Sequence, residues 1–254
     1  MSRLVIANWK NNTTLSDAKA LVQKLLPQIE GLTGVDVVLC PPGPWIGSVL
    51  EMIQGSQVKL GVQNVYYAEG GSFTGEVTPR LLKGICDYVL VGQYERRIYF
   101  DEKEGIVRRK LESVLRQGMS PVLCVGETAD DLDDGAGPYV LTHQLETALE
   151  DGVLDPRLVI AYEPVWTTMG RVNPPPLSYV EQMAGHIRET LAELFSAAAV
   201  EPIRVIFGGS VNARNASEIA ALSGVDGVMT GAGSVNAETF VAITRSFAQV
   251  DRSA

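Results

Sequence analysis

Short apolar runs recur at near-regular intervals along the chain, and each is rich in Val, Ile and Leu. They occupy residues 4–9, 35–40, 58–64, 87–92, 121–127, 158–164, 203–209 and 227–233. Within each run the apolar positions are continuous rather than alternating, which is typical of parallel strands buried on both faces. The pattern therefore predicts a parallel sheet of eight strands.

Two segments between these runs, 102–117 and 179–195, repeat apolar residues at helical spacing and are predicted to be amphipathic helices. Each begins with a polar pair at the spacing of an N-terminal cap. The pairs are Asp101 with Glu104, and Ser178 with Glu181.

Strand and helix patterns alternate from one end of the chain to the other. Eight strand–helix units in 254 residues give about 32 residues per unit, the size of a repeating βα module. This repetition favours a closed (β/α)8 barrel, and an open doubly wound sheet is the alternative. No linker divides the chain, so we expect residues 1–254 to form a single domain of the α/β class.

Composition and charge narrow the functional classes. The chain has 21 Lys and Arg against 30 Asp and Glu, a net charge of −9, which argues against nucleic acid or an anionic membrane as a partner. The three cysteines, Cys40, Cys86 and Cys124, lie in apolar runs and are predicted to be buried free thiols. The chain has no apolar run of membrane-spanning length and no signal peptide, so a soluble, cytoplasmic protein is expected.

Polar residues collect where the predicted strands end. In a (β/α)8 barrel these carboxyl ends form one rim, and active sites lie there. A single polar residue at a strand end is explained by the loop that follows, but the whole set favours a functional site. The set comprises Asn8, Lys10, Gln63, Asn64, Gln93, Glu95, Glu127, Glu163, Gly208–Ser210 and Gly231–Ala232.

The residue types on this rim suit proton transfer next to a carbonyl group. Glu163 follows an apolar strand and precedes a proline, so it could be a carboxylate with the raised pKa of a general base. Lys10 could stabilise negative charge, and the glycine turns at 208–210 and 231–232 could hold a phosphate through backbone N–H groups. The simpler alternatives are a surface lysine, a carboxylate paired with arginine, and glycines required by tight turns. No His/Cys cluster has the spacing of a metal site.

At these residues the sequence resembles the triosephosphate isomerase family. The matching stretches are NWK (8–10), GVQNVYYAEGGSFTGEVTP (61–79), GQYERRIYF (92–100), PVLCVGET (121–128), AYEPVW (161–166) and FGGSVNARNA (207–216). They span nearly the whole chain in the family's order. The resemblance implies a (β/α)8 barrel, a homodimer, and interconversion of dihydroxyacetone phosphate and glyceraldehyde 3-phosphate without a cofactor or metal.

The resemblance also implies roles for individual residues. Glu163 matches the catalytic base, Lys10 the electrostatic lysine and Glu95 the acidic residue beside the site. The positions that match substrate-binding residues are Asn8, Gly170, Ser210, Gly231 and Ala232. The loop 66–78, with Thr74 at its tip, matches the segment that inserts into a partner subunit.

The sequence departs from the family at the electrophilic histidine. The family's Gly-His-Ser-Glu-Arg-Arg is Gly-Gln-Tyr-Glu-Arg-Arg here, so Gln93 takes the histidine position as a fourth candidate catalytic residue. Its amide can donate a hydrogen bond to a carbonyl oxygen but does not readily relay a proton. The histidines of the chain, His143 and His186, lie in predicted helices, and neither is expected to replace it.

Two further departures affect the segment that closes over the site in the family. The glycine-rich lid is replaced by residues 167–173, followed by three prolines at 174–176. Phe207 takes the place of a tyrosine whose hydroxyl latches the closed lid. Both changes concern lid closure, which excludes water from the reaction.

Three functions fit these features. The first is a triosephosphate isomerase that uses Gln93 as its hydrogen-bond donor. The second is an isomerase of another small sugar phosphate, such as a tetrulose phosphate. The third is a catalytically weak or non-catalytic phosphate-binding protein or dimeric scaffold.

Overall fold

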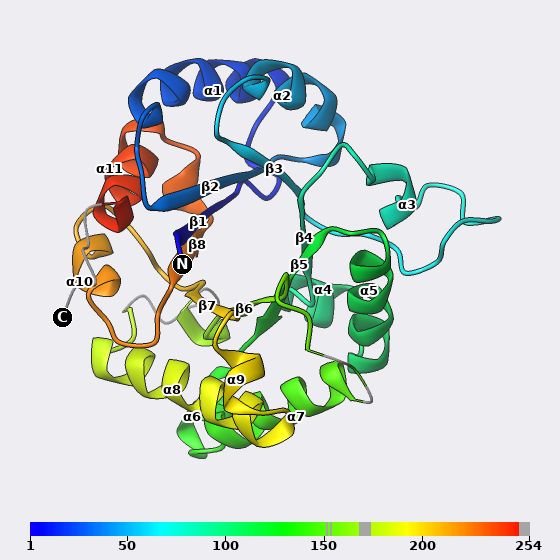
Figure 1. The fold of residues 1–254 in the computed structure, drawn as a ribbon, viewed down its shortest axis with the longest axis vertical. Coiled ribbons are helices and arrows are strands. Elements are labelled where there is room, and N and C mark those ends of the chain that lie inside the picture. The colour runs from blue at the N-terminus through cyan, green and yellow to red at the C-terminus, as the bar shows by residue number, and fades with distance from the viewer. Residues whose placement is uncertain (151, 153, 168–173, 249–254) are drawn as a thin grey trace.

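The eight apolar runs form the strands of a closed parallel barrel. The structure is a computed structural model that describes residues 1–150, 152, 154–167 and 174–248. In this part of the chain each strand pairs with its neighbour in sequence, and β8 returns to β1, for example through Ile6 and Met229 (Figure 1). The predicted barrel is confirmed and the open sheet is wrong. The strands are β1 (Arg3–Asn8), β2 (Val35–Cys40), β3 (Lys59–Val62), β4 (Tyr88–Val91), β5 (Ser120–Val125), β6 (Val159–Tyr162), β7 (Arg204–Phe207) and β8 (Gly227–Thr230).

Helices surround the barrel and cover its outer surface (Figure 1). The loop between β3 and α3 projects away from this ring. The α-helices of the described residues are α1 (Leu15–Ile29), α2 (Ile46–Ile53), α3 (Pro79–Leu82), α4 (Tyr94–Tyr99), α5 (Glu104–Arg116), α6 (Ala129–Asp133), α7 (Gly137–Leu149), α8 (Leu177–Leu194), α9 (Ala197–Val200), α10 (Ala216–Ala220) and α11 (Ala237–Ala248). Short 3-10 helices occupy Gly43–Trp45, Val165–Thr167 and Ala232–Ser234.

Both predicted amphipathic helices are present, but their predicted caps are wrong. Helix α5 begins after Lys103, and no side chain caps it. Asp101 instead has a left-handed backbone, with φ of 51°, and its carboxylate pairs with Lys103. Helix α8 begins after Pro176, so Ser178 lies inside the first turn rather than before it. The proline occupies the boundary position that the serine was predicted to hold, and its ψ of 138° keeps it just outside the helix.

The continuous apolar runs are explained by two hydrophobic layers. Successive strand side chains point to opposite faces, so Leu4 and Ile6 pack inside the barrel while Val5 and Ala7 pack against the helices. Cys40, Cys86 and Cys124 are free and buried, as predicted. Because both faces are buried, polar side chains are displaced to the strand ends, where they surround the mouth of the barrel.

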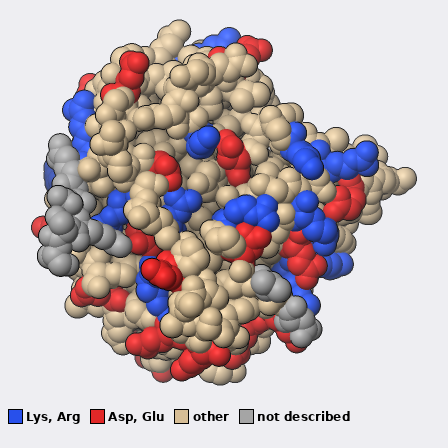
Figure 2. Space-filling view, in the orientation of Figure 1, with Lys and Arg blue, Asp and Glu red and all other residues tan. Residues whose placement is uncertain are grey.

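Acidic and basic side chains are intermixed on the viewed face of the protein (Figure 2). Figure 2 shows acidic and basic side chains lying beside one another across the viewed face, with acidic ones gathered along its lower edge. None of the described helices is long and apolar enough to cross a membrane.

Candidate active site

A cavity of about 410 Å3 lies at the carboxyl ends of the barrel strands. It brings together Asn8 from β1, Glu163 after β6 and the turns that follow β7 and β8. Of the residues singled out in the sequence, it is lined by Asn8, Lys10, Glu163, Ser210, Gly231 and Ala232. Gln93 and Glu95 adjoin it through contacts with Glu163 and Lys10. Gly170 lies outside the described residues.

Glu163 is the buried carboxylate of this cavity, with an exposed fraction of 4%. Its main-chain N–H donates to Val125 C=O at 2.7 Å, which extends the β5–β6 pairing and fixes where the side chain begins. Burial, and after it the negative charge of Glu95, raise the pKa of Glu163, while Lys10 and the main-chain N–H of Tyr94 oppose the shift, and the resulting pKa is about 7. A carboxyl group with this pKa can both accept and return a proton near neutral pH.

Lys10 follows β1 in a strained conformation. Its φ of 49° lies in the left-handed region, which is unfavourable for a residue with a side chain. Gln63 holds this backbone in place, because its Nε2 donates to the C=O groups of Lys10 and Cys40 at 2.9 Å each. The sequence identified Gln63 only as a polar strand-end residue and did not reveal this clamp.

The ammonium group of Lys10 forms an ion pair with Glu95. Burial lowers the pKa of Lys10, but the hydrogen bond and charge of Glu95 outweigh it, so the net pKa is raised. The ammonium also lies 5.6 Å from the ring centre of Tyr94. Lys10 is therefore a fixed cation at the edge of the cavity.

Gln93 is buried at the junction of β4 and α4, with an exposed fraction of 6%. Its Oε1 accepts a hydrogen bond from Nδ2 of Asn8 at 2.9 Å, and its Nε2 lies 3.5 Å from each carboxylate oxygen of Glu163. The preceding Gly92 has φ of 73°, and an added Cβ would lie 2.9 Å from the guanidinium of Arg97. A glycine is required there for the chain to place Gln93 at the cavity.

The glycine turns after β7 and β8 form the opposite wall. Nδ2 of Asn215 donates to Ser210 C=O at 2.8 Å, and Oγ of Ser234 donates to Gly231 C=O at 2.6 Å. Both turns are thus held in shape by a nearby side chain. At Gly209 a Cβ would lie 2.2 Å from the ring of Phe207, so a larger residue here would have to displace that ring.

A second buried carboxylate, Glu127, lies behind the cavity. Its Oε1 accepts from the hydroxyls of Tyr162 and Tyr179, at 2.9 and 3.2 Å, and from the indole N–H of Trp166 at 2.8 Å. Burial raises the pKa of Glu127, and these donors oppose the shift. The sequence marked Glu127 only as a strand-end residue and did not reveal that two tyrosines and a tryptophan donate to it.

The histidines of the chain lie away from the cavity. His143 is on α7 and His186 on α8, as predicted. Nε2 of His186 lies 2.9 Å from both Thr142 Oγ1 and Pro138 C=O, so this ring joins two outer helices. Gln93 is therefore the group at the histidine position, and neither histidine replaces it.

The loop 66–78 is held against helix α5. The guanidinium of Arg109 lies 4.1 Å from the ring centre of Tyr67, and Arg116 forms an ion pair with Glu69 at 3.1 Å. Thr74 is exposed on this loop. These contacts hold the loop, which projects from the ring of helices as an arm (Figure 1).

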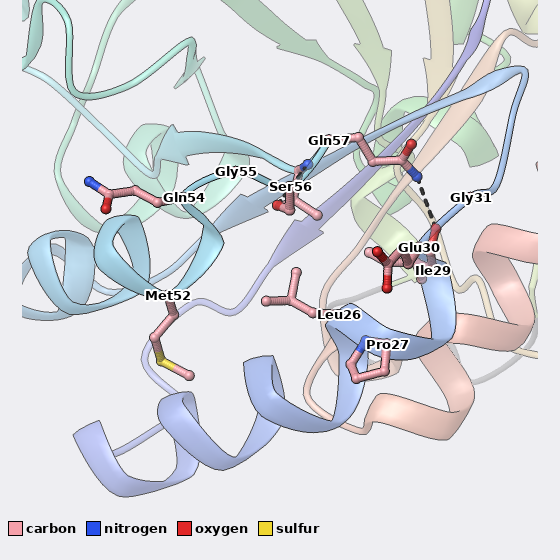
Figure 3. A pocket seen from close by; sticks show the side chains of 11 residues that line it. Leu26, Pro27, Ile29, Glu30, Gly31, Met52, Gln54, Gly55, Ser56 and Gln57 are labelled. Carbon is pink, nitrogen blue, oxygen red and sulfur yellow. Dashed lines mark hydrogen bonds between the residues drawn. The ribbon is translucent and has the colours of Figure 1, made fainter.

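A second hollow, of about 310 Å3, lies between the C-terminal ends of α1 and α2 (Figure 3). Its polar contact is a hydrogen bond from Gln57 Nε2 to Ile29 C=O at 2.9 Å. Of the described residues that line it, Glu30 alone is charged. The other polar side chains of this hollow are neutral, namely Gln54, Ser56 and Gln57, and none of its lining residues supplies a cation or a second carboxylate beside Glu30. The cavity at the strand ends is therefore the better candidate site.

Comparison with known proteins agrees with this arrangement. A family model described as triosephosphate isomerase matches residues 3–247. A triosephosphate isomerase of Dehalococcoides mccartyi is 39% identical over 251 residues, which cover 98% of this chain and 98% of that protein. Proteins of the same name from Prosthecochloris aestuarii and Herpetosiphon aurantiacus are 38% and 37% identical, covering 96% and 95% of this chain and 97% and 98% of their own lengths. The chain therefore belongs to the triosephosphate isomerase family and is an isomerase of the intramolecular oxidoreductase class.

Proposed function

We propose that this protein interconverts dihydroxyacetone phosphate and glyceraldehyde 3-phosphate through an enediolate, with Glu163 as the base. The observation that carries the proposal is the environment of Glu163. Its carboxylate is buried at the cavity, its pKa is raised to about 7, and a hydrogen-bond donor from Gln93 lies beside it. A phosphate-binding protein without catalysis would not need a carboxylate held in this way.

The reaction follows from the groups around the cavity. The turns at 208–210 and 231–232 hold the substrate phosphate through main-chain N–H groups. Glu163 removes a proton from the carbon next to the carbonyl, and the electron pair moves to the carbonyl oxygen. Lys10 and the amide of Gln93 stabilise the resulting negative charge. Glu163 then returns the proton to the former carbonyl carbon, and the isomerisation is complete once a proton has also passed between the two substrate oxygens.

The amide of Gln93 cannot carry the proton that passes between the two substrate oxygens. One proton must also pass from one substrate oxygen to the other, and an amide donates a hydrogen bond without giving up its proton. This transfer therefore proceeds through the carboxyl group of Glu163 or through water. Glu95 holds Lys10 in place through their ion pair. The proposed substrate-binding set also includes Gly170, and Asn8, which lines the cavity, supports that set.

We also propose that the protein acts as a homodimer. The arm 66–78 carries exposed Phe73, and exposed Leu81 lines the same hollow, with exposed fractions of 40% and 62%. Large apolar side chains exposed in one region are typical of an interface. Thr74 on this arm is the residue that we expect to reach the partner's cavity.

An enzyme assay tests the proposed reaction. Glyceraldehyde 3-phosphate turnover, coupled to reduction of the dihydroxyacetone phosphate formed, is expected for the wild type and not for Glu163→Gln. Equal rates for the two proteins would disprove the proposal. Turnover confined to tetrose or pentose phosphates would instead establish the second function. Binding of phosphoglycolate without turnover of any of these substrates would establish a phosphate-binding protein.

A further inference from the structure

A directional series of hydrogen bonds runs from the backbone of Lys10 to the cavity. The main-chain N–H of Lys10 donates to Oδ1 of Asn8 at 3.2 Å. Nδ2 of Asn8 then donates to Oε1 of Gln93 at 2.9 Å. The series joins residues 85 positions apart in the chain, and it ends at the amide that occupies the histidine position of the family.

The direction of this series is determined at its first member. A main-chain N–H can only donate, so the side-chain atom of Asn8 that faces it must be the oxygen. The amide nitrogen of Asn8 is left to face Gln93, and a nitrogen donor requires the oxygen of Gln93 as its acceptor. The Nε2 of Gln93 is therefore turned away from Asn8 and toward Glu163.

The first member cannot easily change its direction. Lys10 has a left-handed backbone, and Gln63 holds its C=O from the other side at 2.9 Å. Gln63 thereby holds the strained backbone of Lys10 in place. The main-chain N–H of Lys10, to which the side chain of Asn8 is bonded, keeps its orientation as a result. The orientation of Gln93 thus depends on the backbone of the catalytic lysine.

Among the described residues, the acceptors near the donor end of Gln93 are either distant or weak. Its Nε2 lies 3.5 Å from both carboxylate oxygens of Glu163, 3.5 Å from Sγ of Cys124 and 3.7 Å from Sδ of Met229. Amide hydrogen bonds to oxygen are normally close to 2.9 Å, and thiol and thioether sulfurs are weak acceptors. An oxygen atom that enters the cavity therefore finds a donor already aimed and not firmly engaged.

We propose that Asn8 is a positioning residue that fixes which end of the Gln93 amide faces the substrate. Asn8 keeps the Gln93 oxygen away from the cavity, where it would repel the enediolate and Glu163, and keeps Nε2 toward the reacting oxygen. This role rests on the proposed isomerase reaction, since that reaction supplies the oxygen. It differs from direct contact with substrate because it acts through a second side chain.

A double-mutant cycle tests the role in catalysis. In Asn8→Asp the new carboxylate cannot donate, so Gln93 must turn its NH2 group toward that carboxylate and present its oxygen to the cavity. We expect kcat for glyceraldehyde 3-phosphate to fall about 100-fold, as when an oxyanion donor is removed. In a Gln93→Leu background the same change is expected to lower kcat by less than about threefold. An equal loss in both backgrounds would overturn the proposal, because charge or direct substrate contact acts in both.

A second measurement does not depend on turnover. In protein carrying 13C-methyl Met and 15N amides, the side-chain NH2 signals of Gln93 are assigned by their loss in Gln93→Leu, and the Met229 methyl by its loss in Met229→Leu. A nuclear Overhauser effect between the two is expected in the wild type and not in Asn8→Asp, while the other Met methyl signals stay in place as a control for folding. Its absence from the wild type, or its persistence in Asn8→Asp, would disprove the positioning role. If the wild type does not turn over glyceraldehyde 3-phosphate but this effect behaves as expected, the isomerase proposal alone has failed.

Discussion

The amide nitrogen of Gln93 lies 3.5 Å from both carboxylate oxygens of Glu163, although the two residues are 70 positions apart in the chain. This contact joins the proposed base to the proposed electrophilic donor. It is also a reason to expect that the proposed reaction does not require a histidine at position 93. The donor needs only to be aimed at the oxygen that becomes negative.

The pH dependence of activity is expected to report the ionisation of Glu163. Because the pKa of Glu163 is raised to about 7 and the base must be ionised, kcat/KM should rise with pH and level off above about 7. A rate profile from about pH 5 to about pH 9 measures this. A rise in kcat/KM centred near the ordinary pKa of a carboxyl group would contradict the assignment of Glu163 as the base.

The raised pKa of Glu163 also predicts how the stability of the folded protein depends on pH. The folded protein keeps a proton on Glu163 that the unfolded chain releases, so stability falls as pH rises from the ordinary carboxyl pKa to about 7. Glu163→Gln cannot ionise and is expected to be more stable than the wild type above this window, by about 1–3 kcal/mol. Urea unfolding at two pH values tests it, and the difference between the proteins should shrink at low pH.

Replacing the amide of Gln93 is expected to change kcat more than KM. Gln93→Leu removes the donor and should lower kcat by about 100-fold. Gln93→His restores a group that both donates and relays a proton, and it should raise kcat by about tenfold. Steady-state measurements of kcat and KM for both variants test these two expectations. An unchanged or lower rate in Gln93→His would mean that Asn8 and Met229 form a site adapted to an amide.

Lys10 is expected to lower the pKa of Glu163 as well as to stabilise the enediolate. Lys10→Met should reduce kcat/KM by about 100-fold or more and move its acid limb to higher pH, because a positive charge beside Glu163 is lost. Lys24→Met, at an exposed position on α1, is the control for loss of charge. A rate loss with an unmoved acid limb would argue that Lys10 contacts only the substrate.

The proposed dimer predicts a specific effect at the projecting arm. The double variant Phe73→Asp and Leu81→Asp places charge in the exposed apolar region and should produce monomers with reduced activity. Sedimentation velocity measures the change in mass. Tyr139→Asp on α7 is the matched control, since its ring is 75% exposed but lies on a different helix. A wild type that sediments as a monomer would exclude the dimer.

The sequence alone determined the barrel and the rim on which its polar residues lie. The continuous apolar runs followed from strands buried on both faces, and the positions after them had to be polar because the strands end there. The prediction of helix starts was weaker. The side-chain pairs at Asp101 and Ser178 had the right spacing, but Lys103 and Pro176 occupy the boundaries instead.

Tertiary structure alone decided how the polar residues are connected. Asn8 and Gln93 are 85 positions apart, and only closure of the barrel brings the amide of one to the oxygen of the other. Closure also buries Glu163, and this burial sets its raised pKa, which no local pattern contains. A sequence states which groups are available at the ends of strands. The direction of a hydrogen bond and the energy of a buried charge depend on neighbours that only the folded chain supplies.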